Sequence, residues 1–213
     1  MHRLRLKFSR GENLKFLSHL DLMRLWERAL RRAGMPPAYS EGFSPHPKIS
    51  LAAPLPVGVT SQAEIMDVFL GRRITPGVFV QRVVPQLPDG IAIIDIMDVN
   101  LQAPSLQSRL RLAEYIVEIN TQGDSRQAEE EIPLLLAKEQ LAWHHARDTG
   151  ERYYDLRVLI DDIWLDAKTD AGYRIGMRLR CDSSGSGRPE QVIKALGFDE
   201  TLVSTERIKL IFD

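Results

Sequence analysis

The chain of 213 residues is poor in cysteine and has no long apolar run. Its single cysteine, Cys181, excludes an internal disulfide, a zinc site of several thiolates and an iron–sulfur cluster ligated by this chain alone. No run of about 18 apolar residues is present, so no membrane-spanning helix is expected. The stretch MHRLRLKFSRGEN lacks the apolar core of a signal peptide. These absences predict a cytoplasmic protein without a bound metal or cofactor and without a membrane partner.

Charge is distributed unevenly along the chain, although the net charge is only −1. The first 50 residues hold ten Lys and Arg against four Asp and Glu, so they carry +6 and the remainder carries −7. A basic segment on a nearly neutral protein indicates a local anionic partner, such as RNA or an acidic protein surface.

Hydrophobic periodicity predicts the order β-α-β-β-α-β in the first half of the chain. LRLKF at 4–8 alternates as a half-buried strand does, and the helix that follows has Ser18 as N-cap and Asp21 three residues later. Its pattern ends at Gly34. Shorter extended pieces, a second helix and a closing strand are expected near 37–40, 48–52, 63–70, 75–86 and 90–99.

The second half is expected to repeat this order, with a short helix from 189 and a closing strand at 202–212. Its earlier elements are a strand at 113–119, a helix at 125–141, and two hairpin-like pairs with turns at 148–151 and 168–172. The sequence therefore predicts an α+β fold of two tandem ferredoxin-like (βαββαβ) units. We place the units at 1–100 and 110–213, joined by a linker at 101–109.

Basic residues gather on one helix face and on two strand faces, where they either contact phosphates or form solvated surfaces. Arg24, Arg28 and Arg32 follow one another at a spacing of four along the first helix. The strand faces lack the aromatic residues that stack bases, so we expect phosphate binding there and no reading of bases. The candidate RNA- or anion-binding residues are Arg3, Arg5, Lys7, Arg24, Arg28, Arg32, Lys48, Arg174, Arg178, Arg180 and Arg188.

The stretch SSGSGRPE at 183–190 precedes the last helix and is rich in glycine and serine. Its backbone N–H groups either cradle an anion, with Arg188 adding charge, or belong to a flexible connection. The phosphate-binding pattern GxxxxGK[ST] is absent, so no nucleotide-binding loop is expected.

Two histidines are candidates for acid–base chemistry. His19 lies in the first turn of the helix beside Asp21, and His46 stands between two prolines in the loop 39–50, which also holds Glu41. If the loop folds over the start of the helix, these four residues converge into a catalytic set or a weak metal site. Otherwise His19 belongs to the helix cap and the prolines merely stiffen the loop.

We expect the loop YSEGFSPHPKIS (39–50) to be a preorganised recognition element packed against the start of the first helix. Its prolines limit backbone freedom, so little entropy remains to be lost on binding. Phe43 is expected to anchor the loop in the core, with Glu41, His46 and Lys48 facing a ligand. The alternative is a connector whose polar side chains are dispensable.

Together these motifs resemble the radical SAM-linked protein family, a bacterial domain of unknown function. The resemblance lies in Phe16, Ser18, His19 and Asp21 of the helix motif, in the loop at 39–50, in PLPVGV at 54–59 and in GSGRPEQVIKALG at 185–197. It implies a radical SAM protein as partner. No CxxxCxxC motif is present, so this chain would be the companion and not the radical generator.

Charge and resemblance together predict a non-catalytic RNA-binding adaptor that works with a radical SAM enzyme in RNA modification or processing. A metal-independent endoribonuclease that uses His19 and His46 as acid and base is an alternative, because two such groups suffice for RNA cleavage. A second alternative is a pure protein-interaction module for the radical SAM partner.

Overall fold

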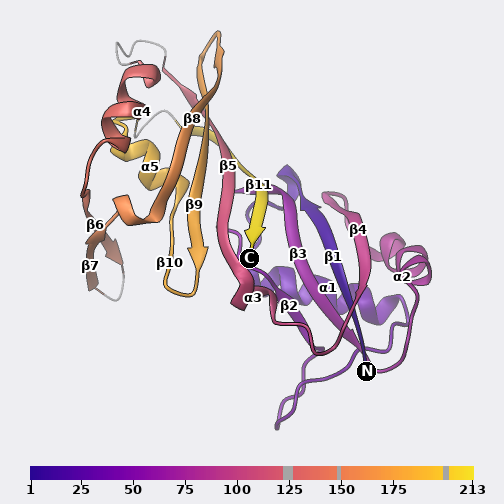
Figure 1. Ribbon diagram of the computed structural model, residues 1–213. Helices are drawn as coiled ribbons and strands as arrows, with labels where there is room; N and C mark the ends of the chain where they lie inside the picture. The colour runs from indigo at the N-terminus through magenta and orange to yellow at the C-terminus, as the bar shows by residue number, and fades with distance from the viewer. Residues whose placement is uncertain (122–126, 148–149, 199–201) are drawn as a thin grey trace. The chain divides into compact units, whose positions relative to one another are not determined.

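The computed structural model describes residues 1–121, 127–147, 150–198 and 202–213 and divides into two compact units. Unit 1 comprises Met1–Leu110 and unit 2 comprises Arg111–Asp213. The fold is mixed α+β: the described residues contain five α-helices, and the strand pairings within each unit are mainly antiparallel (Figure 1). None of the helices in the described ranges has the length and apolarity that a bilayer crossing requires.

Unit 1 is built on four antiparallel strands in the order β2–β3–β1–β4. The alternation in β1 places Leu4, Leu6 and Phe8 in the core, where all three are fully buried, as the sequence predicts. The strands are β1 (His2–Arg10), β2 (Ile49–Leu51), β3 (Thr60–Leu70) and β4 (Ile91–Val99).

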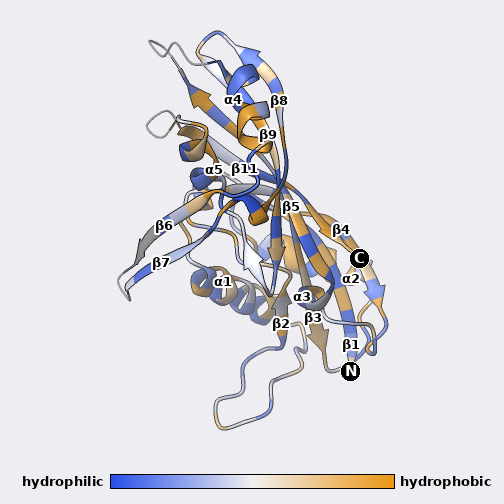
Figure 2. Ribbon diagram, turned by 60° about the vertical axis from the view of Figure 1, so that its left-hand side comes forward, coloured by the Kyte–Doolittle hydropathy of each residue, from blue (hydrophilic) through white to orange (hydrophobic). Residues whose placement is uncertain are grey.

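Three α-helices accompany this sheet: α1 (His19–Arg32), α2 (Pro76–Val83) and α3 (Leu106–Arg109). α1 begins where expected, because Ser18 Oγ accepts the backbone N–H of Asp21 at 3.2 Å. The apolar stripe of α1 is visible in Figure 2. Trp26 of this helix is fully buried and packs edge-on against Phe8, with 5.1 Å between ring centroids.

Unit 2 has four long strands in the order β8–β9–β5–β11 and a short β10 that also pairs with β9. A separate two-stranded sheet, β6–β7, stands apart from them. The strands are β5 (Leu110–Asn120), β6 (Ala142–Arg147), β7 (Gly150–Asp155), β8 (Ile160–Thr169), β9 (Gly172–Asp182), β10 (Gly185–Ser186) and β11 (Leu202–Phe212). The helices are α4 (Ala128–Leu136) and α5 (Pro189–Ala195).

The prediction of an α+β protein is confirmed, whereas two tandem ferredoxin-like units stay a prediction. The β-α-β-β-α-β order expected for the first half is found in unit 1, but unit 2 adds β6–β7 and β10 to that plan. The expected linker at 101–109 includes α3, which belongs to unit 1. The helix expected at 125–141 is shorter and ends at Leu136, and residues 125–126 lie outside the described ranges.

Candidate nucleic-acid interface

α1 forms one wall of a cleft of about 600 Å³ within unit 1. The opposite wall is residues 85–88, the proline-flanked turn between α2 and β4. Each proline limits the freedom of the backbone, so this wall is stiff. The side chains that α1 contributes are those of Leu17 just before it and of Asp21, Arg24, Leu25, Arg28 and Arg32.

The three cleft arginines differ in what they contact. Arg24 lies 3.5 Å from the carboxylate of Asp21, and both side chains are more than half exposed, so this pair is weak. Arg32 donates a 2.6 Å hydrogen bond to the carbonyl of Gln86, which ties α1 to the opposite wall. Arg28 is exposed, and no carboxylate within the described ranges pairs with it. At 1.5 Å per residue, the row extends for about 12 Å along the helix.

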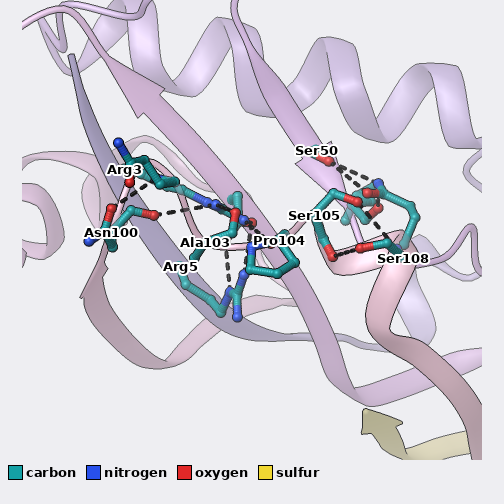
Figure 3. Close-up of polar contacts among 12 residues, drawn as sticks. Arg3, Arg5, Ser50, Asn100, Ala103, Pro104, Ser105 and Ser108 are labelled. Atoms are coloured by element: carbon teal, nitrogen blue, oxygen red, sulfur yellow. Dashed lines mark hydrogen bonds and ion pairs between the residues drawn. The ribbon is translucent and has the colours of Figure 1, made fainter. Parts of the chain in front are cut away.

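Arg3 and Arg5 of β1 face an internal carboxylate rather than solvent. Arg3 is 3% exposed and lies 2.5 Å from Asp67, while Arg5 Nε lies 2.8 Å from the other oxygen of the same carboxylate. Arg3 also donates to the carbonyls of Ala103 at 2.6 Å and Pro104 at 3.0 Å (Figure 3). These contacts hold the fold of unit 1 together. Both arginines are therefore left out of the proposed interface, whereas Lys7 on the same strand is exposed.

The arginines of β9 are also paired with carboxylates. Arg178 binds Glu114 at 2.9 Å and Asp161 at 3.2 Å, and the hydrogen bond to Glu114 raises the pKa of its guanidinium. Arg174 lies 3.3 Å from Asp166, and Arg180 lies 2.9 Å from Asp182. The predicted basic face of unit 2 is thus largely neutralised by its own acidic neighbours.

The glycine-rich segment 183–190 binds a carboxylate of the chain itself. The backbone N–H groups of Ser184 and Gly185 donate to Asp182 Oδ1 at 2.8 and 3.2 Å. Burial would raise the pKa of Asp182, but hydrogen bonds from the Ser184 hydroxyl and from Arg180 hold that pKa well below its usual range. An internal anion therefore takes these two donors, and Arg188 lies 3.8 Å from Glu190.

The structure does not bring His19 and His46 together. His19 starts α1, which follows the Arg10 end of β1, whereas the loop begins near a bridge between Pro37 and Leu70. Leu70 pairs with His2, at the other end of β1, so the two histidines belong to opposite ends of α1. Among the residues that the structure describes, no three His, Cys, Asp or Glu side chains form a metal-binding group.

The expectation that Phe43 anchors the loop in the core is wrong, because its side chain is 110% exposed. The expected packing of the loop against the start of α1 is wrong too. Between α1 and β2, the loop projects away from the rest of unit 1 in both views (Figures 1 and 2). The few residues around Gly42 have no periodic pattern of apolar side chains, so the direction of the Phe43 side chain could not be predicted from the sequence.

Sequence reasoning also missed the proline-flanked wall of the cleft and two exposed arginines, Arg72 and Arg73, in the turn after β3. The two arginines follow Gly71, whose N–H donates to the carbonyl of Pro36 at 2.8 Å. Their neighbouring positions and the flanking glycine were the signal that would have marked them as a surface turn.

The chain is a member of the family described as "Uncharacterized protein conserved in bacteria (DUF2344)", whose model matches residues 3–189. No curated protein matches the sequence.

Solved structures that resemble this chain do so at low sequence identity. A chain from "Crystal Structure of a Cbf5-Nop10-Gar1 Complex" has a TM-score of 0.50 at 9% identity, covering 97% of this chain and 47% of that one. A chain from "Crystal structure of the archaeal box H/ACA sRNP Nop10-Cbf5 complex" has a TM-score of 0.45 at 10% identity, covering 97% and 46%. This chain therefore spans about half the length of both, and the first likeness shows a related fold alone.

Proposed function

We propose that this chain is a non-catalytic RNA-binding adaptor whose phosphate contacts lie in the cleft beside α1. The observation that carries the proposal is the row of Arg24, Arg28 and Arg32 along one wall of that cleft. Arginine binds phosphate oxygens through a planar fork of donors, and a row of such groups follows the regular spacing of phosphates along a strand.

The contrast with the other arginines supports this choice of surface. Arg3, Arg5, Arg174, Arg178 and Arg180 each have a carboxylate partner within 3.3 Å, so an incoming phosphate would have to displace that partner. Arg28 has no such competitor among the described residues, and the long contact of Arg24 with Asp21 is exposed. A phosphate should therefore bind more favourably to the arginines of α1 than to the other arginines.

The adaptor role includes a protein partner, which we propose to be a radical SAM protein. This part of the proposal is supported by the resemblance of the motifs at 17–34, 39–50 and 185–197. We also propose that each unit is an elaborated ferredoxin-like unit, supported by the strand orders β2–β3–β1–β4 and β8–β9–β5–β11. Co-purification of a radical SAM protein with the tagged chain after nuclease treatment would support the partnership independently of RNA.

Charge reversal tests the RNA-binding proposal directly. Replacing Arg24, Arg28 and Arg32 by Glu should abolish retention of RNA in filter binding at low salt, because three attractive contacts become repulsive. A control variant with Lys138, Lys194 and Lys209 replaced by Glu changes the net charge equally on exposed positions of unit 2. The proposal fails if wild-type protein retains no RNA at low salt, or if both variants weaken binding equally.

We expect no RNA cleavage by this chain. An endoribonuclease built on His19 and His46 needs both groups at one scissile bond, and they belong to opposite ends of α1. Total cellular RNA incubated with the protein should stay intact over roughly pH 5–8, the range in which histidine changes its charge. Discrete products that disappear in a His19→Ala, His46→Ala double variant would restore the enzymatic hypothesis.

A further inference from the structure

The loop 39–47 is a closed, finger-like element held by its own backbone. Residues Tyr39 and Pro47 form a bridge, and the N–H of Ser40 donates to the carbonyl of His46 at 2.9 Å. The N–H of His46 donates in return to Ser40 Oγ at 3.1 Å. Below this pair, the N–H of Lys48 donates to the carbonyl of Ala38 at 2.7 Å, and the N–H of Phe69 in β3 donates to the carbonyl of Lys48 at 3.0 Å, which fixes the loop to the end of β3.

The tip of this finger presents an aromatic ring to solvent. Phe43 is 110% exposed, and the preceding Gly42 has a φ of +123°, a conformation that side-chained residues rarely adopt. A fully exposed phenylalanine ring contributes no buried apolar area to the folded state. Single exposed apolar side chains are common on protein surfaces, so the case for a ligand at Phe43 depends on the charges of the segments that flank the loop.

Positive charge is concentrated in the chain segments that flank the finger. Arg31 and Arg32 end α1, Lys48 follows the loop, and Arg72 and Arg73 lie in the turn that the bond from Gly71 to Pro36 holds beside that base. All five cations are exposed, and no carboxylate within the described ranges pairs with any of them. The loop itself holds one acidic residue, Glu41. We call this set the basic collar: Arg31, Arg32, Lys48, Arg72 and Arg73.

We propose that Phe43 stacks on an unpaired base of an RNA whose phosphates contact the basic collar. The inference rests on the proposed RNA-binding function and adds a base contact that the cleft cannot provide, because the cleft is lined by no aromatic residue. Positive grooves combined with protruding aromatic rings are what proteins use to hold single-stranded nucleic acid without reading its sequence.

Charge complementarity favours RNA over an apolar pocket of a protein as the occupant. A protein pocket that accepted Phe43 would bring its own rim against five cations, whereas the sugar-phosphate backbone beside an unstacked base supplies matching anions. The collar also continues the row on α1, since Arg32 belongs to both. One strand can thus contact the cleft and the finger without leaving unit 1.

Two probes separate base stacking from phosphate contact: a single-stranded oligoadenylate and the same sugar-phosphate backbone without bases. Phe43→Ala should lower the affinity for oligoadenylate by about ten- to a hundredfold, the range for one stacked base, and leave the affinity for the abasic strand unchanged. Phe43→Trp should keep both affinities. Phe16→Ala is the matched control, because Phe16 is another exposed phenylalanine of unit 1, at 73%, but precedes α1.

Each outcome decides between the two proposals. If Phe43→Ala changes neither affinity while Arg28→Glu weakens both, the stacking inference is overturned, RNA binding stands, and a protein pocket becomes the occupant to test. Equal losses for both probes, or equal losses in the Phe16→Ala control, also overturn stacking. If wild-type protein binds neither probe at low salt, the proposed function itself fails and the inference fails with it.

Discussion

Units 1 and 2 both carry rows of arginine, but the rows have different surroundings. On β9 the cross-strand register sets Arg174 opposite Glu118 and Arg178 opposite Glu114 of β5. On α1, Arg32 donates to the backbone carbonyl of Gln86, and Arg28 pairs with no carboxylate of the described residues. A row of basic residues therefore indicates a binding surface only when the neighbouring strand or helix places no acidic residues opposite it.

The largest effect is expected from removing the buried carboxylate of Asp67, which pairs with Arg3 and Arg5. Asp67→Ala leaves Arg3 buried without a counter-charge, and we expect the free energy of unfolding to fall by about 3–5 kcal/mol in urea denaturation. Asp98→Ala is the control, because it removes an exposed carboxylate that pairs with His2 and should cost about 1 kcal/mol or less. Equal losses would show that Arg3 is not a structural arginine.

Replacing the arginines of α1 or of β9 by a neutral residue should distinguish arginines that bind RNA from arginines that form internal ion pairs. With Arg24, Arg28 and Arg32 replaced by Gln, the slope of log K against log salt for single-stranded RNA should become shallower by about 2, or roughly 0.7 for each lost phosphate contact. The matched variant, with Arg174, Arg178 and Arg180 replaced by Gln, should keep the wild-type slope. A shallower slope in the second variant would contradict the assignment of those arginines to internal ion pairs.

The free energy of unfolding should depend on pH through the carboxylate of Asp182, which the glycine-rich segment binds. The pKa of Asp182 is lowered in the folded state, so its stabilising contribution is present above the unfolded value of about 4 and is lost as the pH falls through the folded value. Asp182→Asn should therefore reduce the free energy of unfolding by roughly 1.5–3 kcal/mol near neutral pH, the range for hydrogen bonds to a charged group.

Below about pH 4 the difference in the free energy of unfolding between the wild type and Asp182→Asn should shrink, because the wild-type carboxyl then also loses its charge. Thermal unfolding of both proteins at a series of pH values measures this. A deficit that stays constant down to the most acidic pH would show that the carboxylate's charge is unimportant to the loop.

The smallest expected effect concerns the polar side chains of the projecting loop. Replacing both His46 and Lys48 by Ala should weaken RNA binding several-fold, as expected for one lost phosphate contact. The melting temperature should stay unchanged, because both side chains are exposed. Filter binding and thermal unfolding on the same preparation test this. Unchanged affinity would make His46 and Lys48 dispensable parts of a connector.

Much of unit 1 is predictable because its signals are local. Ser18 caps α1 through its own helix turn, Thr75 caps α2 in the same way, and the alternation of β1 defines its buried side without reference to other strands. In unit 2, Pro133 lies inside α4, and the helix ends earlier than its apolar residues indicate.

The candidate site was only half predictable for a related reason. The spacing of Arg24, Arg28 and Arg32 is visible in the sequence, but whether an arginine is free depends on partners far along the chain. Arg3 and Asp67 are 64 residues apart, and Arg178 and Glu114 are equally distant. α3 was missed because four residues behind the Ser105 cap are too few to show a period.

The central position of β1 has a consequence for the synthesis of the protein on the ribosome. β1 is made first but pairs on one side with β3 and on the other with β4, where Arg3 lies opposite Val99. At the usual rates of elongation, roughly 5–20 s pass before the second neighbour of β1 exists. During that interval at least one edge of the nascent strand stays unpaired beside its apolar face. A chaperone that covers extended apolar segments should therefore bind the growing chain until residue 99 has emerged, and release it afterwards.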